Sequence, residues 1–147
     1  MLNISEATSL AFHALAVLAR EPGRRRSNTE LAASLGASEA HLAKVLSRLA
    51  RAGLVLSSRG RGGGVALTGE ASRISLWQVY ELLEGPPEVR ACLAGPQGGR
   101  PCGPDCILGD LLHSVQEQVR DKFEQTYLTD LAAAPLDGLR ARAGATA

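Results

Sequence analysis

Aromatic residues are scarce in this chain: Phe, Trp and Tyr make up 3% of its 147 residues, although 45% are hydrophobic. The core must therefore consist mainly of Leu, Ala and Val, a composition that favours helices. The chain also lacks an apolar run of about eighteen residues, and it does not start with a basic segment followed by an apolar one. We therefore expect a cytoplasmic protein without a membrane span. Its length suits one domain plus an appendage.

Motifs of the common enzyme classes are missing as well. The chain contains no G-x-S-x-G, no phosphate-binding G-x-x-x-x-G-K-[ST] and no H-E-x-x-H. Its glycine-rich run, residues 59–64, is not followed by the helix that a phosphate-binding loop requires. We therefore expect no catalytic activity.

Cysteine occurs only as Cys92, Cys102 and Cys106, with nine and then three residues between them. An odd number of thiols in a cytoplasmic protein argues against a structural disulfide framework. Such closely spaced thiolates suit an iron–sulfur cluster, another soft metal or tetrahedral zinc, and a thiol switch or no role at all are the alternatives. A fourth ligand would have to come from His113, or from His13 or Glu6 of a partner chain.

The net charge of +1 hides an uneven distribution. Residues 20–73 contain ten Lys and Arg against four acids, a net charge of +6, whereas residues 74–147 contain six against ten, a net charge of −4. A basic middle between acidic flanks indicates that only the middle meets a polyanion.

Two capped helices lie in this basic segment. Ser27 and Glu30 form the capping-box pattern S-N-T-E before a short helix that ends at Gly36, and Ser38 then caps a second helix that ends at Gly53. Two short helices joined by a glycine-containing turn are typical of a helix-turn-helix. The second helix has an apolar stripe on one side, formed by Leu42, Val45, Leu46 and Leu49, and hydrogen-bond donors and cations on the other, which suits the major groove of DNA.

A glycine-rich hairpin follows directly. Residues 54–57 and 65–68 have the pattern of paired strands, and Arg59 and Arg61 lie in their connection. Such a hairpin is expected to act as a wing on the DNA backbone, although a solvated hairpin tip is the alternative. Arg24 to Arg26 can add phosphate contacts. The predicted DNA-binding residues are Ser27, Ser38, His41, Lys44, Ser47, Arg48, Arg59 and Arg61.

Three further helices are predicted outside this segment, over residues 4–20, from Ser75 to about 84, and from about 107 to 131. Trp77 and Tyr80 in the middle one are expected to fill core rather than bind a ligand. The last helix has a nearly heptad-like apolar stripe and too little domain to cover it, which predicts a two-fold dimer. The fold class is thus mainly α with a small β-hairpin. The expected parts are a DNA-binding domain (1–86), a cysteine-containing sensor loop (87–107), a dimerisation helix (108–134) and a flexible tail (135–147).

The order of these motifs resembles a known family, the bacterial winged helix-turn-helix regulators typified by the IscR and NsrR repressors. The resemblance covers about residues 1–132. Its matching pieces are I-S-E-A-T-S-L-A-F-H-A-L-A-V-L-A, S-E-A-H-L-A-K-V-L-S-R-L-A-R-A-G-L-V, the wing S-S-R-G-R-G-G-G-V-A-L, I-S-L-W-Q-V-Y-E-L-L-E-G, and the cysteine loop before a long helix. The resemblance implies a homodimer that regulates transcription and an iron–sulfur cluster on the three cysteines. It implies a fourth ligand that varies among members: a histidine after the cysteines, or an acid or histidine from the partner's first helix.

This chain departs from the family pattern around its cysteines. The familiar pattern is near C-x5-C-x5/7-C, whereas this chain has a longer first gap and a shorter second gap. Ile107 to Gly109 stand where a histidine is expected, and Ser9 replaces the acid of nitric-oxide-sensing members. The expected function is therefore a dimeric repressor that binds a palindromic operator in double-stranded DNA and responds to a cluster or to thiol state through a shift between two arrangements of its recognition helices. The alternatives are a cluster-free regulator and a metal-binding or electron-transfer protein that uses the winged helix for protein contacts.

Overall fold

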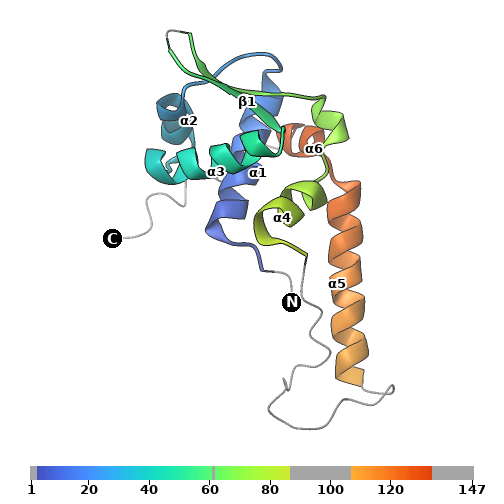
Figure 1. The fold of residues 1–147 in the computed structure, drawn as a ribbon. Coiled ribbons are helices and arrows are strands. Elements are labelled where there is room, and N and C mark those ends of the chain that lie inside the picture. Colours follow the sequence, from blue (N-terminus) through green and yellow to red (C-terminus); the bar gives the residue numbers. More distant parts are fainter. Residues whose placement is uncertain (1–2, 61, 87–106, 134–147) are drawn as a thin grey trace.

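The computed structural model describes residues 3–60, 62–86 and 107–133. Its elements are α1 (Glu6–Arg20), α2 (Asn28–Leu35), α3 (Glu39–Arg51), β1 (Val55–Ser58), β2 (Gly64–Leu67), the 3₁₀ turn η1 (Ala71–Arg73), α4 (Leu76–Glu84), α5 (Ile107–Gln125) and α6 (Leu128–Ala133). Figure 1 shows a helical body with the β1–β2 hairpin at one end and α5 extending from the other. This architecture confirms the predicted fold class, mainly α with a small β-hairpin.

Helix α1 is the centre of the body and contacts α2, α3, α4, α6 and β2. The fully buried side chains include Leu15 of α1, Leu31 of α2, Leu42 and Leu49 of α3 and Val79 of α4. Apart from Thr8, the largest fully buried side chains are all Leu or Val. The core is therefore aliphatic, as the shortage of aromatic residues predicted.

Four of the five aromatic residues join α5 to this body. The rings of Phe12 and Phe123 meet edge to face at 5.9 Å, those of Tyr80 and Phe123 at 6.2 Å, and those of Trp77 and Tyr80 stack at 5.3 Å between centroids. Trp77 and Tyr80 are buried, which confirms that they fill core. The guanidinium of Arg120 on α5 lies 5.2 Å from the Trp77 ring centre, where a cation is attracted to the π face.

The prediction of one continuous helix over residues 107–131 is wrong. The chain leaves the helical path at Thr126 and Tyr127, where the Leu76 N–H donates to the Thr126 carbonyl at 2.9 Å and the Leu128 N–H donates to the Ile74 carbonyl at 3.0 Å. This pairing turns the chain so that Leu128 enters the core, where it is fully buried. The break thus exchanges helical hydrogen bonds for sheet-like ones and adds a core residue.

The first helix was predicted from residue 4, but α1 begins at Glu6 with Ser5 as its N-cap, so Ile4 lies outside the helix and is 50% exposed. No helix within residues 3–60, 62–86 and 107–133 is both long and apolar enough to cross a membrane. The three cysteines, Arg61 and residues 135–147 lie outside the described residues.

Candidate nucleic-acid interface

Helices α2 and α3 form the predicted helix-turn-helix. Gly36 adopts a left-handed conformation, with φ +63°, and the Ala37 N–H donates to the Ala32 carbonyl at 3.0 Å, which ends α2 and turns the chain. Two contacts fix α2 and α3 relative to each other, and no sequence pattern indicated either of them. The Asn28 amide donates to the Glu39 carbonyl oxygen at 3.0 Å, and the Thr29 hydroxyl donates to the Glu39 carboxylate at 2.9 Å.

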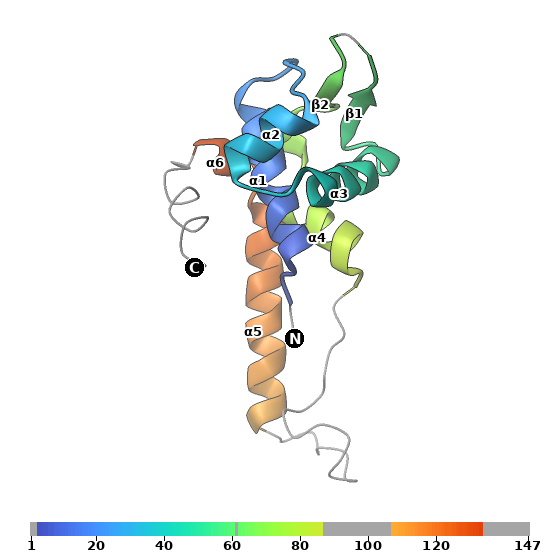
Figure 2. The ribbon, with the colours of Figure 1, turned by 90° about the vertical axis from the view of Figure 1, so that its left-hand side faces the viewer.

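The predicted two faces of α3 are confirmed. Leu42, Val45, Leu46 and Leu49 are buried against the body, whereas Lys44, Ser47 and Arg48 are exposed. Figure 2 shows α3 at the edge of the body below the hairpin, with α5 running away from both. The exposed side of α3 and the wing thus lie at the same end of the molecule.

Ser27 and Ser38 are both helix N-caps. The Ser27 Oγ accepts from the Glu30 N–H at 3.1 Å and the Ser38 Oγ accepts from the His41 N–H at 3.4 Å, which leaves each hydroxyl proton able to donate to a phosphate. The capping box predicted at Ser27 is only half formed. The Glu30 carboxylate accepts instead from Arg24 and Arg26, each at 3.2 Å, because two guanidinium groups attract it more strongly than one neutral N–H. The complete capping box joins Ser75 and Gln78.

An ion cluster, made of Glu21, Arg24, Arg26 and Glu30, fixes the base of the wing. The Glu21 carboxylate lies 2.9 Å from Arg24 and 2.7 Å from Arg26. The hydrogen bond from Arg26, together with the charges of both arginines, lowers the pKa of Glu21 against the effect of its partial desolvation. Arg24 and Arg26 are thus committed to carboxylates, although the sequence suggested them for phosphate contacts.

The wing is attached through the backbone of Arg26. Strands β1 and β2 pair antiparallel, with Val55 opposite Leu67 and Ser58 opposite Gly64. The Arg26 N–H donates to the Val65 carbonyl at 2.9 Å, and the Val65 N–H donates back at 2.8 Å. This bridge between Arg26 and Val65 involves a single residue outside the hairpin, so no strand pattern in the sequence could indicate it.

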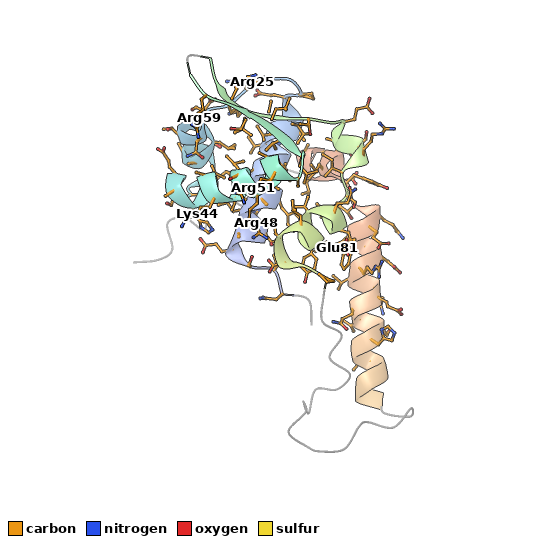
Figure 3. The ribbon with its side chains drawn as sticks, in the orientation of Figure 1. Arg25, Lys44, Arg48, Arg51, Arg59 and Glu81 are labelled. Atoms are coloured by element: carbon orange, nitrogen blue, oxygen red, sulfur yellow. The ribbon has the colours of Figure 1, made fainter. Side chains whose placement is uncertain are left out.

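Exposed cations line the wing and α3. Arg25 reaches the wing, where it donates to the Ser58 hydroxyl at 2.6 Å, and Arg59 is exposed. In Figure 3, Arg25 and Arg59 lie along the hairpin, whereas Lys44, Arg48 and Arg51 lie along α3. Arg25 is the one arginine of the 24–26 run outside the ion cluster, and its role depends on packing that the sequence does not show.

His41 and Arg48 make contacts with α1 and α4, respectively. The His41 Nδ1 lies 3.6 Å from the Glu6 carboxylate of α1. The Arg48 Nη2 donates to the carbonyl oxygens of Leu82 at 3.0 Å and Leu83 at 2.9 Å, in the last turn of α4. The structure therefore directs the guanidinium of Arg48 toward α4.

The three candidate fourth ligands lie in different places. Glu6 is the partner of His41, and His113 lies 3.7 Å from Glu117 on an exposed part of α5. The His13 Nδ1 donates to the Ser9 carbonyl at 2.7 Å, so Nε2 is the ring nitrogen that could bind a metal. Within the described residues no group of three or more His, Cys, Asp and Glu is placed to hold a metal ion.

Helix α5 exposes apolar side chains on its free side. Leu111 is 54% exposed and Val115, one turn later, is 48% exposed. They are four positions apart in the sequence, so they lie on the same face of the helix. This face is the one that the heptad-like pattern predicted to meet a partner chain.

Comparison with known proteins gives consistent matches over most of the chain. A family model described as "Rrf2: Iron-dependent Transcriptional regulator" matches residues 4–134. The HTH-type transcriptional repressor NsrR of Streptomyces coelicolor is 34% identical over 138 residues, which cover 91% of this chain and 90% of that protein.

Solved structures match as well. CymR, named the global cysteine regulator of B. subtilis, superimposes with a TM-score of 0.74 at 29% identity, covering 90% of this chain and 98% of that one. The oxidised form of Staphylococcus aureus CymR gives 0.71 at 26% identity, with coverage of 91% and 98%. The T. potens IscR structure gives 0.70 at 24% identity, with coverage of 88% and 85%, and shares the fold. These matches confirm the predicted winged helix-turn-helix.

Proposed function

We propose that this chain, which belongs to the Rrf2 family of transcriptional regulators, is a dimeric repressor that binds a palindromic operator. A family of regulators rather than enzymes agrees with the absence of catalytic motifs. One observation carries the proposal: the donor-rich side of α3 is exposed at the same end of the molecule as a basic wing.

The DNA-binding residues of the proposal act in three ways. Lys44 and Ser47 on the exposed side of α3, with His41 at its first turn, contact base edges in the major groove. The N-caps Ser27 and Ser38 donate to phosphates at helix N-termini, where the helix dipole attracts anions. Arg59 and Arg61, joined by Arg25, contact the backbone beside the groove. Arg48 was predicted to join the first set, but its guanidinium donates to α4 carbonyls.

The partner proposed for α5 is a second copy of the chain. Its exposed Leu111 and Val115 would bury against the same residues of the partner, as a two-fold axis requires. Such a dimer would present two copies of α3 to half-sites about one helical turn apart on one face of the DNA. A palindromic operator follows from that symmetry.

The proposed signal is the state of Cys92, Cys102 and Cys106. Three thiolates with one imidazole are a donor set that suits an iron–sulfur cluster, and His13 is held in the tautomer that a metal-binding Nε2 needs. A bound cluster would supply one-electron chemistry at this site. The family description, iron-dependent, supports this version of the proposal.

A second candidate signal is thiol oxidation without a metal. It is supported by the likeness to CymR, which is named as a cysteine regulator and whose structure matches in its oxidised form. In this version two of the three thiols form a disulfide, and an oxidant removes the two electrons and the two protons.

Two measurements test the proposal. Selection from random double-stranded DNA should return a two-fold symmetric sequence that the protein prefers over its scrambled version, and selection without any consensus would contradict an operator-binding role. Iron and sulfide analysis of anaerobically purified protein should then find both elements bound, with visible absorption. Iron-free protein whose operator affinity changes on oxidation would replace the cluster by the thiol signal.

A further inference from the structure

A cluster of polar groups joins α3, the proposed recognition helix, to α4 and α1. We call it the α1–α3–α4 junction, and it consists of Ser5, Thr8, Arg48, Glu84 and the carbonyl groups of Leu82 and Leu83. Its members are 34 to 79 residues apart in sequence across the three helices, so no local pattern indicates it. Figure 3 shows Arg48 between α3 and α4.

Arg48 is the α3 member of the junction. Its Nη2 donates to the Leu82 carbonyl at 3.0 Å and to the Leu83 carbonyl at 2.9 Å. These carbonyls belong to the last turn of α4, where the helix has unpaired acceptors and the negative end of its dipole. A cation is favoured there for both reasons, so the contact suits Arg48 electrostatically as well as geometrically.

Glu84 connects the same turn of α4 to α1. Its carboxylate accepts from the Ser5 N–H at 3.0 Å and from the hydroxyl of Thr8, which is fully buried. Desolvation alone would raise the pKa of Glu84, but the hydrogen bonds from Ser5 and Thr8 and the charge of Arg48 outweigh it and lower that pKa. The last turn of α4 is therefore held on one side by α1 and on the other by α3.

We propose that Arg48 is a positioning residue of the DNA interface, which sets the angle of α3 through the α1–α3–α4 junction instead of contacting DNA itself. The inference rests on the proposed function, because it assumes that α3 enters the groove. Lys44 lies one turn before Arg48 on α3, so a rotation of the helix about this anchor moves Lys44 and Ser47 relative to the bases. Contacts of α2 with Glu39 fix the other end of the helix.

Operator affinity at several salt concentrations tests this role. In the full chain, Arg48→Ala should weaken operator binding about tenfold, as the removal of one well-placed base contact does, and leave the log–log salt slope unchanged. The control Lys44→Ala should lower that slope by about one unit if Lys44 contacts a phosphate, or relax preference at one base pair if it contacts a base. A lower slope, or relaxed preference at one base pair, in Arg48→Ala would overturn the inference.

A double-mutant cycle gives an independent test. Glu84→Gln weakens the same turn of α4 without removing a side chain from α3, so it should reduce operator affinity to a smaller degree. The double variant Arg48→Ala/Glu84→Gln should bind as Arg48→Ala does, because both changes act through one junction. If the two effects multiply, Arg48 acts independently of the junction, and the inference fails.

Two further variants separate positioning from loss of folding. Arg48→Lys keeps a cation that can donate to the same carbonyls, and it should recover most of the affinity. Thr8→Val keeps the buried volume but removes the donor to Glu84, and it should lower affinity although α1 does not enter the groove. All affinities are measured well below each variant's unfolding midpoint. If Arg48 only stabilised the fold, Arg48→Ala would lower the unfolding midpoint but leave the operator affinity of the folded protein unchanged. That result would also overturn the inference.

The wild type distinguishes this inference from the proposed function. Wild-type protein that binds a symmetric operator specifically, together with a lowered slope in Arg48→Ala, overturns the inference alone. Wild-type protein that shows no sequence preference overturns the proposed function and, with it, the positioning role.

Discussion

At the scale of single residues, Gly64 shows how a local constraint positions the wing. Its φ of +143° is outside the range that side chains favour, and a Cβ there would lie 2.6 Å from the Arg26 carbonyl oxygen. That oxygen accepts from the Val65 N–H at 2.8 Å, in the pairing that attaches the wing to the body. A side chain at Gly64 would therefore separate the wing from its anchor.

Gly64→Ala should accordingly lower both the unfolding midpoint and the operator affinity. We expect a destabilisation of about 1–3 kcal/mol, since the change combines an unfavourable φ with a backbone clash. Gly69→Ala is the matched control, because a Cβ at Gly69 meets nothing within 4 Å. Thermal unfolding and operator titration of the two variants make the comparison. Equal behaviour of the two would contradict the anchoring role of the Arg26–Val65 pair.

Glu84 gives a prediction about pH. Its pKa in the folded protein is lowered from the usual value of about 4.3, so the ionised form is favoured by folding. The resulting stabilisation is fully present above that usual value and is lost as the pH falls through the lowered pKa. The unfolding midpoint of the wild type should therefore drop on acidification below about pH 5, and the drop should be smaller in Glu84→Gln. Parallel curves for the two proteins would show that Glu84 does not contribute.

At the scale of elements, the helices with local signals were predictable and those shaped by distant contacts were not. Ser38 and Gly53 mark the ends of α3 in the sequence, and the structure places the helix at Glu39–Arg51 between them. The hairpin was predicted one residue early on β1 and one late on β2. The break between α5 and α6 depends on pairing with Ile74 and Leu76, about 50 residues away in the chain, which no local pattern shows.

The residues of the candidate site likewise divide into those that the sequence could predict and those that it could not. The exposed side of α3 follows from its periodicity, so Lys44 and Ser47 could be identified from the sequence. The partner of each arginine could not be identified from the sequence, because a guanidinium binds whichever acceptors the fold brings near. Arg24 and Arg26 meet Glu21 and Glu30, whereas Arg48 meets α4.

The attachment of α5 depends on Phe123, which contacts both Phe12 and Tyr80. Phe123→Ala should destabilise the protein by about 2–4 kcal/mol, and α5 should loosen from the body. Trp77 is the single tryptophan and lies in the same aromatic cluster, so its emission should shift to longer wavelength in the folded variant. Phe123→Leu, which keeps an apolar side chain, is the control and should retain most of the stability. An unchanged emission maximum in Phe123→Ala would contradict the docking role of this residue.

At the scale of the whole molecule, the basic middle is proposed to meet DNA, and the acidic C-terminal half is proposed to meet a second copy of the chain. Helix α5 extends away from the wing in both Figure 1 and Figure 2. An interface between two copies on α5 would therefore leave both DNA-binding ends free. The same separation allows the two contacts to be changed independently by mutation.

Leu111→Glu/Val115→Glu should convert the proposed dimer into a monomer, because four like charges would meet across the two-fold axis. Sedimentation velocity measures the change. Glu117→Gln, an exposed substitution on the same helix, is the control and should stay dimeric. The monomeric variant should bind a single half-site as weakly as it binds the palindrome. A variant that remains dimeric would assign the interface to another face.

The salt dependence of operator binding is the most direct measure of DNA binding by α3 and the basic wing. Wild-type affinity for the selected operator should fall steeply as salt rises, and Arg59→Ala should reduce the log–log slope by about 0.9 for each phosphate that Arg59 neutralises, with sequence preference unchanged. Lys122→Ala, which removes the same charge on α5, should leave the slope as in the wild type. Equal slopes for wild type and Arg59→Ala, or an affinity indifferent to both sequence and salt, would contradict DNA binding by α3 and the wing.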